Sequence, residues 1–385
     1  MRIVYCIPST YKSGGIERVL SIKANYLADV WGYDVHIVTT SQNNQKPFYP
    51  FSSRITFHDL DINYDIEQKP LYKQVIQRIK KIRKHKKELA RLLSAVNADI
   101  VISMFTHEMR FLYKINDGSK KILELHFSKY YKELHAQYNN YSFLKLSITK
   151  LLSRLDFNYC KKYDAFVVLT EEDKNAWVGY KNIFVISNPI PFQIKEATDP
   201  TSRNIIAVGR LCKQKGFDLL LQAWNMIDIE DRKEWSLSIY GQGPNKEELD
   251  DYIKLHDLYD VTIHKPVNYI KSVYLDASII AFSSRYEGLP MVLLESMALG
   301  VIPISFKCPC GPRDIIVDGK NGILIDCFNV AEFAKKLKLI MNDTAYRSEL
   351  SKQAHQSIKA QYEVDKIMPK WKSLFETLTS KVEHH

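Results

Sequence analysis

The chain has 385 residues, of which 45% are hydrophobic and 25% charged, a composition typical of a soluble globular protein too long for one ordinary core. No apolar run reaches the roughly 20 residues of a membrane-spanning helix, and the six cysteines lack metal-binding spacing. The net charge of +10 is uneven, because residues 1–195 hold 30 basic against 18 acidic residues, so we expect the first half to meet an anionic partner.

Apolar strand-like segments alternate with helix-like segments, which predicts parallel sheets covered by helices on both faces. The first segment is too short for a signal peptide and is expected to be a strand. Strands are predicted at 2–8, 34–40, 55–60, 98–105, 120–127 and 164–170, and helices at 14–31 and 71–96. After a break the pattern returns, with strands at 204–210, 235–243, 260–265, 278–284, 302–306 and 322–325, and helices at 216–227, 245–258, 291–300 and 331–342.

The break is a segment with three prolines and no periodicity, at 187–203, which indicates a linker. We therefore expect an α/β fold of two doubly wound, Rossmann-like domains that face a cleft formed by the carboxyl ends of their strands. The expected units are a first domain at 1–190, a linker at 191–203, a second domain at 204–362, a helix at 363–381 that packs back on the first domain, and an expression-tag remnant at 382–385.

The segment RYEGLPMVLLESMALG carries two glutamates eight positions apart at the end of a predicted strand. Glu287 and Gly288 are expected in the cleft, and the free amides of Met291 and Val292 open a helix that can bind an anion. Glu295 follows one turn later, where a carboxylate can accept two hydrogen bonds from a vicinal diol. A nucleotide sugar offers a diol, a diphosphate and sugar hydroxyls in this order, whereas the alternative is a surface helix with two solvated glutamates.

Two cations follow another predicted strand of the second domain. Arg210 ends that strand, and Lys215 precedes Gly216 and a helix. Such cations at a cleft are suited to neutralising a diphosphate, although a lone basic loop would indicate only a solvated surface. The turn GQG at 241–243 is weak evidence by itself.

These motifs together resemble one enzyme family. GGIERVL, GRL…KG, GQGP, EGLPMVLLE and SMALG occur in the order found in the retaining nucleotide-sugar glycosyltransferases of family 4, which have the GT-B fold. The resemblance runs from Arg2 to about Trp371. It implies transfer of a hexosyl or N-acetylhexosaminyl group from a nucleotide-sugar, with UDP favoured over GDP, to a glycan acceptor in surface polysaccharide synthesis. It also implies a polyprenyl-diphosphate-linked acceptor and a cytoplasmic enzyme on the inner face of the membrane.

The resemblance assigns roles to residues of both domains, with the acceptor bound by the first and the nucleotide-sugar by the second. It implies that Glu295 holds the ribose, that Glu287 faces the transferred sugar, and that Arg210 and Lys215 hold the diphosphate and the leaving oxygen. The other expected donor contacts are the Gly14-Gly15 turn, the loop from Lys265 to Val267 beside the base, and Gly288, Leu289, Met291 and Val292.

A histidine at the end of a first-domain strand is also expected from the family, and KILELHF supplies His126 as a catalytic candidate; a structural histidine is the alternative reading. His107 is a weaker candidate for acceptor contact. A retaining front-face transfer needs no enzyme nucleophile, because the departing phosphate takes the acceptor proton. We predict no metal and no cofactor, and we interpret Asp59-Leu60-Asp61 as a loop although it matches a metal-binding pattern.

Residues 71–96 are predicted to form a helix with one apolar face packed against the domain. Its cations form a stripe suited to a polyphosphate or to anionic lipid headgroups, with a solvated face as the bland alternative. By family resemblance this helix meets the diphosphate of a lipid-linked acceptor. We expect acceptor and membrane contacts from Lys80, Lys84, Lys87 and Arg91.

Aromatic residues follow in FSKYYKELHAQYNNYSF, and the sequence leaves open whether they meet a membrane interface, stack on sugars or belong to the core. They are Tyr130, Tyr131, Tyr138, Tyr141 and Phe143. Two other functions remain open at this point, a nucleotide-sugar epimerase on the same fold and a non-catalytic protein that binds an anionic polymer. Nucleic acid is disfavoured as the partner, because the charge lies on one helix and no base-reading module is recognised.

Overall fold

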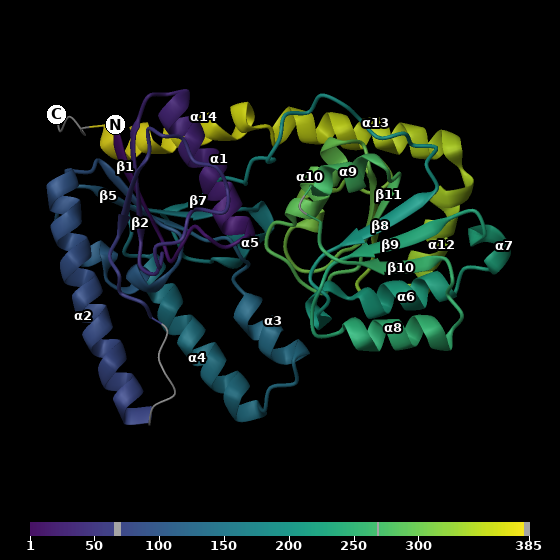
Figure 1. Cartoon of the computed structure of the whole chain (residues 1–385), viewed down its shortest axis with the longest axis horizontal. Coiled ribbons are helices and arrows are strands. Elements are labelled where there is room, and N and C mark those ends of the chain that lie inside the picture. The colour runs from purple at the N-terminus through teal and green to yellow at the C-terminus, as the bar shows by residue number, and fades with distance from the viewer. Residues whose placement is uncertain (65–70, 268, 381–385) are drawn as a thin grey trace.

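A computed structural model describes residues 1–64, 71–267 and 269–380, so the proposed tag remnant lies outside the described residues. Within this part, the chain forms one sheet of seven strands and one of six, and all the strand pairs are parallel. Figure 1 shows the two sheets in separate lobes that lie side by side. The predicted α/β architecture of two doubly wound domains is confirmed.

The first sheet has the order β3-β2-β1-β4-β5-β6-β7. Its strands are β1 (Arg2–Ile7), β2 (Asp34–Thr39), β3 (Thr56–Asp59), β4 (Ile100–Ser103), β5 (Lys120–Glu124), β6 (Ala165–Val168) and β7 (Ile183–Val185). The helices around it are α1 (Gly15–Asp29), α2 (Leu71–Val96), α3 (Tyr131–Tyr138), α4 (Phe143–Cys160) and α5 (Glu171–Ala176), with two short 3-10 turns, η1 (His107–Arg110) and η2 (Leu112–Lys114). Alternation along β1 sends Ile3 and Tyr5 into a core under α1, and Val4 and Cys6 into a core under α2 and α4.

The second sheet has the order β10-β9-β8-β11-β12-β13. Its strands are β8 (Asn204–Val208), β9 (Ser236–Tyr240), β10 (Val261–His264), β11 (Ile279–Phe282), β12 (Ile302–Phe306) and β13 (Ile323–Ile325). Its helices are α6 (Phe217–Asn225), α7 (Ile229–Arg232), α8 (Lys246–Leu255), α9 (Ile270–Leu275), α10 (Met291–Ala298), α11 (Pro312–Ile315), α12 (Val330–Asn342) and α13 (Thr344–Gln361), and the 3-10 turn η3 (Lys213–Lys215) follows β8.

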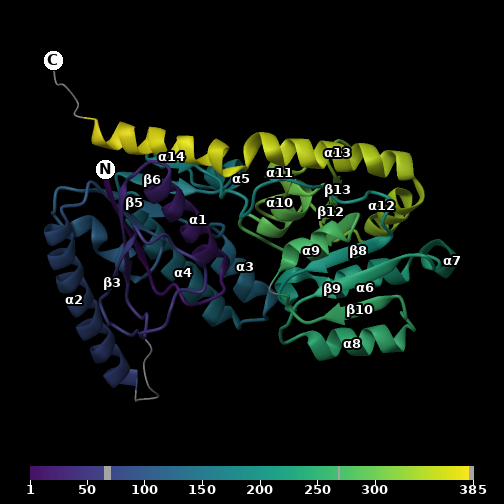
Figure 2. The same cartoon turned by 45° about the horizontal axis from the view of Figure 1, so that its top comes forward.

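Two segments of the chain cross between the domains. The first crossing leads into residues 191–203, which form neither helix nor strand, and the second leads from α13 into α14 (Val364–Thr379). The crossings are joined where the Ile190 amide donates to the Tyr362 carbonyl at 2.9 Å. Figure 2 shows α13 along the second domain and α14 along the first. Apolar residues of α14, among them Trp371 and Phe375, complete the core beneath α1.

The predicted packing of α2 is only partly right. Leu89 and Leu93 are buried, but Val75, Ile76 and Ile79 in the first turns of the helix are each about half exposed, at 51%, 49% and 46%. The sequence period is helical, as expected, yet the apolar face extends beyond the end of the sheet that would cover it (Figure 1). This end of α2 therefore exposes apolar and basic residues together.

A buried ion pair holds α1 against the first sheet. Lys23 of α1 is fully buried and its ammonium group pairs with the carboxylate of Glu124 at the end of β5. The same ammonium lies 4.5 Å from the ring centroid of Trp371 in α14. Burial lowers the pKa of Lys23, and Glu124 opposes that shift. One cation thus ties together α1, β5 and the returning C-terminal helix.

We expect Lys23→Met to lower the free energy of unfolding by about 3–5 kcal/mol, because it leaves the Glu124 carboxylate buried without its cation. Denaturant unfolding of the purified protein measures this loss. The double variant Lys23→Met/Glu124→Gln should recover most of it, and Lys366→Met, on the exposed side of α14, is the matched control. A single variant as stable as the control would show that the pair does not hold the domain together.

Candidate active site

The glutamate-rich loop and the basic turn of the second domain are joined in space. The Lys215 ammonium lies 2.7 Å from Oε1 of Glu287, although the residues are 72 positions apart. The turn that carries Lys215 lies tightly against the end of β11. Gly216, the next residue, has a φ of +64°, and a Cβ there would clash with the Ser283 carbonyl oxygen. Glu287 is buried at 7% exposure, so Lys215 balances its charge in a poorly solvated place.

Glu295 lies in α10, eight residues after Glu287, with only 3% of its surface exposed. Its Oε2 accepts a hydrogen bond of 3.2 Å from the Tyr274 hydroxyl, and its Oε1 forms an ion pair with the guanidinium of Arg18. Arg18 belongs to α1 of the first domain. The carboxylate predicted to bind ribose is therefore contacted from the opposite domain.

The remaining donor candidates surround these two carboxylates with different degrees of exposure. Arg210 is exposed at the end of β8 and lies close enough to Tyr286 to lower the pKa of its hydroxyl, against the larger raising effect of burial. Gly14 caps the amino end of α1, and a Cβ on Gly15 would meet open space. Val267 is 40% exposed in the loop after β10. Gly288 and Leu289 lead into α10, which begins at Met291 and continues with Val292.

His126 follows β5 and is buried, with 4% of its side chain exposed. Its Nε2 lies 3.3 Å from the Glu124 carboxylate. Burial lowers the pKa of His126 to about 4, although Glu124 opposes the shift, so the ring is neutral at pH 7. A Cβ on Gly288 would lie 3.0 Å from the His126 carbonyl oxygen, which places the Glu287 loop directly against the first domain.

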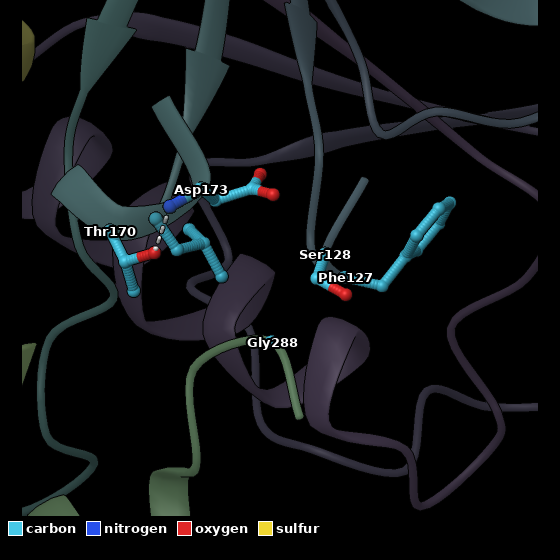
Figure 3. Close-up of a pocket in the computed structure, with 6 residues that line it drawn as sticks. Phe127, Ser128, Thr170, Asp173 and Gly288 are labelled. Carbon is cyan, nitrogen blue, oxygen red and sulfur yellow. Dashed lines mark hydrogen bonds between the residues drawn. The ribbon is translucent and has the colours of Figure 1, made fainter. Parts of the chain in front are cut away.

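A small pocket lies at this contact between the domains (Figure 3). Phe127, Ser128, Thr170 and Asp173 of the first domain line it, and Gly288 of the second domain closes it. The Asp173 amide donates to the Thr170 hydroxyl at 3.1 Å, the bond drawn in Figure 3. The loops that follow β5 and β11 therefore meet at this pocket.

His107 lies away from the Glu287 loop, in η1 beside α2. Its ring stacks on Tyr64 at 3.8 Å between centroids, and burial lowers its pKa, with Arg78 and Arg110 adding to the shift. Its surroundings are thus cationic, as an anionic ligand would need.

The Asp59-Leu60-Asp61 segment begins at the last residue of β3 and continues into a loop. Asp59 accepts hydrogen bonds from the Thr39 hydroxyl at 3.0 Å and the Gln42 amide at 3.2 Å, and the Asp61 carbonyl accepts one from Lys84 at 2.8 Å. Within residues 1–64, 71–267 and 269–380, no group of three or more His, Cys, Asp or Glu residues is placed to hold a metal ion.

An aromatic cluster between the domains was not predicted from the sequence. The Tyr286 ring stacks on Tyr138 at 5.6 Å and meets Tyr131 edge-on at 5.8 Å, and its hydroxyl lies 3.2 Å from His135 Nδ1. Two of the five aromatic residues left open by the sequence therefore pack between the domains, whereas Phe143 is 86% exposed. The position of Tyr286 next to Glu287 could have indicated that this tyrosine belongs to the site. Its aromatic partners could not be predicted, because they lie about 150 residues earlier in the chain.

Comparisons with known proteins find glycosyltransferases. Residues 191–357 match the model of the glycosyl transferases group 1 family. The chain is 28% identical, over 97% of its length and 98% of the relative, to a Campylobacter jejuni N-acetylgalactosaminyltransferase named for a diphospho-undecaprenol-linked substrate. It is 27% identical, over 97% of its length and 99% of the relative, to an amylovoran biosynthesis glycosyltransferase of Erwinia amylovora.

The fold is that of solved glycosyltransferases. Sucrose-phosphate synthase from Thermosynechococcus elongatus superposes with a TM-score of 0.79 over 98% of both chains, at 15% sequence identity. The crystal structure of TarM superposes with a TM-score of 0.78 over 97% of this chain and 98% of the other, at 16% identity. The resemblance seen in the sequence motifs is confirmed, because residues 191–357 match the group 1 glycosyltransferase family and the whole chain has the GT-B fold.

Proposed function

We propose that this glycosyltransferase moves a sugar from a nucleotide-sugar, with UDP as the favoured nucleotide, to a polyprenyl-diphosphate-linked glycan, with retention of the anomeric configuration. We place this reaction in surface polysaccharide or glycan biosynthesis, because the similar enzyme of Erwinia amylovora is named for amylovoran biosynthesis and that of Campylobacter jejuni for a glycan linked to diphospho-undecaprenol. The observation that carries the donor proposal is the convergence of Lys215, Glu287 and Glu295 beside the first-domain loop at His126.

In this proposal the chain's residues bind and neutralise rather than attack. Lys215 and Arg210 stabilise the negative charge that develops on the leaving diphosphate, together with the free amides at the start of α10. Glu287 accepts hydrogen bonds from the transferred sugar, and Glu295 accepts them from the ribose diol. The acceptor hydroxyl attacks the anomeric carbon on the face from which the diphosphate departs, and the departing phosphate oxygen takes the acceptor proton.

His126 contributes as a neutral ring in this scheme. Because its pKa is about 4, it does not serve as a cation at physiological pH, and it can only donate or accept one hydrogen bond at the sugar. Its contact with Glu124 links this ring to the Lys23 ion pair behind it. A buried neutral imidazole beside the reacting carbon also keeps water away from it.

The acceptor proposal rests on the exposed cations of α2. Lys80, Lys84, Lys87 and Arg91 are all exposed, and they occur at intervals of three to four residues, about one helical turn. Arg78, on the same helix, is close enough to His107 to lower its pKa, so the positive charge of α2 also reaches the η1 turn. A row of this kind suits a diphosphate that carries a lipid on one side and a glycan on the other.

We also propose that the enzyme binds an anionic membrane surface through α2 and α4. Helix α4 buries Ser153 and Asp156 beside Phe157 and Cys160, while four of its five leucines are at least half exposed. The exposed apolar residues of α4 are Phe143, Leu144, Ile148, Leu151, Leu152 and Leu155, each at least half exposed. Lys145, Lys150 and Arg154 lie among them and are exposed as well.

Such a surface fits the boundary between headgroups and acyl chains, where leucines enter the apolar layer and cations stay with the phosphates. Among the described residues, no helix is long and apolar enough to cross a membrane. Figure 1 shows α2 and α4 both extending away from the first sheet, with their amino ends farthest from it. In the proposed attachment, the amino ends of α2 and α4 therefore enter the boundary between headgroups and acyl chains without crossing the membrane.

For the donor, we expect Lys215→Ala to lower turnover about 100-fold at saturating UDP-sugar, with a smaller effect on donor binding, because the ammonium acts on charge that develops late. The assay measures product from a diphosphate-linked acceptor, without added divalent metal, and NMR compares the anomeric configuration of product and donor. Lys213→Ala, in the same turn but exposed, is the control. Normal turnover in Lys215→Ala would contradict this role, and an epimerised UDP-sugar formed without acceptor would favour the epimerase alternative.

For the acceptor, Lys80→Glu/Lys84→Glu should leave UDP-sugar binding unchanged and raise the KM for the diphosphate-linked acceptor about tenfold or more, since two attractive charges become repulsive. Steady-state kinetics with a neutral acceptor carrying the same glycan is the decisive comparison. Lys366→Glu/Lys370→Glu on α14 makes the same change of charge elsewhere. Equal damage with both acceptors would mean that the stripe supports the fold only.

For the membrane, Leu144→Ser/Leu151→Ser/Leu155→Ser should reduce binding to phosphatidylglycerol-containing vesicles at least about tenfold, because each buried leucine contributes about 1.5–3 kcal/mol. Sedimentation with vesicles measures binding, and the loss should persist at high salt, where the contribution of the basic stripe is screened. Ser147→Gln/Asn158→Gln changes exposed polar positions of the same helix as a control. Undiminished binding at high salt would exclude insertion of α4.

A further inference from the structure

Arg18 places a first-domain cation on the carboxylate proposed to hold the donor ribose. Its guanidinium pairs with Oε1 of Glu295, while the Tyr274 hydroxyl donates to Oε2. Each oxygen of an ionised carboxylate can accept more than one hydrogen bond, so neither contact uses up the acceptor capacity of its oxygen. The two protein partners of this carboxylate thus come from different domains, Arg18 from the first and Tyr274 from the second.

The surroundings of Glu295 make that cation necessary. The glutamate side chain is 4% exposed and the arginine side chain 25% exposed, so water contributes little to solvating the carboxylate. A carboxylate buried without a cation is costly and tends to take up a proton, after which it accepts hydrogen bonds poorly. Tyr274 is a neutral donor, and burial raises the pKa of its hydroxyl while Arg18 opposes that shift. Arg18 therefore compensates the charge of the Glu295 carboxylate.

The position of Arg18 is itself fixed by the first domain. It stands in the first turn of α1, directly after the Gly14-Gly15 turn, and its amide donates to the Gly14 carbonyl at 3.2 Å. About one and a half turns later, Lys23 anchors the same helix to Glu124. The helix therefore fixes the position of Arg18 within the first domain. When the two domains are in contact, Arg18 meets Glu295 from that position.

We infer that Arg18 is a positioning residue that completes the ribose site from the opposite domain. It acts through Glu295, compensating the charge of that carboxylate and orienting it, and it makes recognition of the ribose diol depend on contact between the domains. A donor lacking the diol would gain nothing from Arg18. This inference rests on the proposed donor site, in which Glu295 accepts hydrogen bonds from the ribose.

The test compares UDP with 2′,3′-dideoxy-UDP by calorimetry. Wild type should prefer UDP by about tenfold or more, the value of charged hydrogen bonds to the diol. Arg18→Ala should lose most of this preference, as Glu295→Gln does, and the double variant should lose no more than either single one. Arg18→Lys, which keeps the charge, should retain part of it. Arg54→Ala, an exposed first-domain arginine, is the control for general effects.

The outcomes separate the inference from the donor proposal. If wild type does not distinguish the two nucleotides, the ribose role of Glu295 fails whatever Arg18 does. If wild type distinguishes them and Arg18→Ala does so equally well, or weakens both nucleotides by the same factor, only the positioning role is overturned. A stronger preference for the diol in Arg18→Ala would mean that the arginine competes with ribose, which also overturns it.

Discussion

Three buried carboxylates at the meeting of the two domains constrain the rest of the structure, because each needs a cation. Glu124 is paired with Lys23, Glu287 with Lys215, and Glu295 with Arg18. Removing one partner from a buried pair costs several kcal/mol, which is comparable to the net stability of a domain. The placement of α1, the η3 turn and α10 is therefore fixed by charge compensation as well as by apolar packing. The Lys23–Glu124 pair lies within the first domain and the Lys215–Glu287 pair within the second. The Arg18–Glu295 pair joins the two domains.

These pairs also determine what a donor meets on arrival. Before it binds, Lys215 already neutralises Glu287, so a diphosphate adds negative charge that this lysine and the exposed Arg210 must share. Lys215, Arg210 and Arg18 face Glu287 and Glu295, so on the proposed function the site is positive when empty and becomes negative when a diphosphate of charge about −2 binds. Arg18 reaches Glu295 from the opposite domain, so its contribution to the site depends on contact between the domains. On the proposed function, binding and domain contact are therefore electrostatically linked.

Local patterns predicted most of the strands and the main helices, because alternation and helical period are properties of neighbouring residues. β7 was missed, since three partly buried residues carry almost no pattern, and α13 was missed because its polar residues are spread around the helix. The family motifs located Glu287, Glu295 and Lys215. The pairings Arg18–Glu295 and Tyr286–Tyr138 join segments 148 or more residues apart, and a single sequence contains no signal of such contacts. The packed face predicted for α2 was partly wrong because period alone does not say where the covering sheet ends.

Charge compensation also explains why apolar residues are exposed on α4, beside the exposed apolar end of α2. A helix in water normally turns its polar side outward, yet α4 buries Ser153 and Asp156, and Asp156 is held there by Arg110 and Lys132 at 3.0 and 2.9 Å. Those two ion pairs fix the rotation of α4, so its leucines cannot turn inward without leaving Asp156 unpaired. The same η1 segment that supplies Arg110 also contacts α2 and carries His107. On the proposed function, one charged contact thus sets both the apolar surface that faces the lipid and the cationic corner that a lipid-linked diphosphate reaches next.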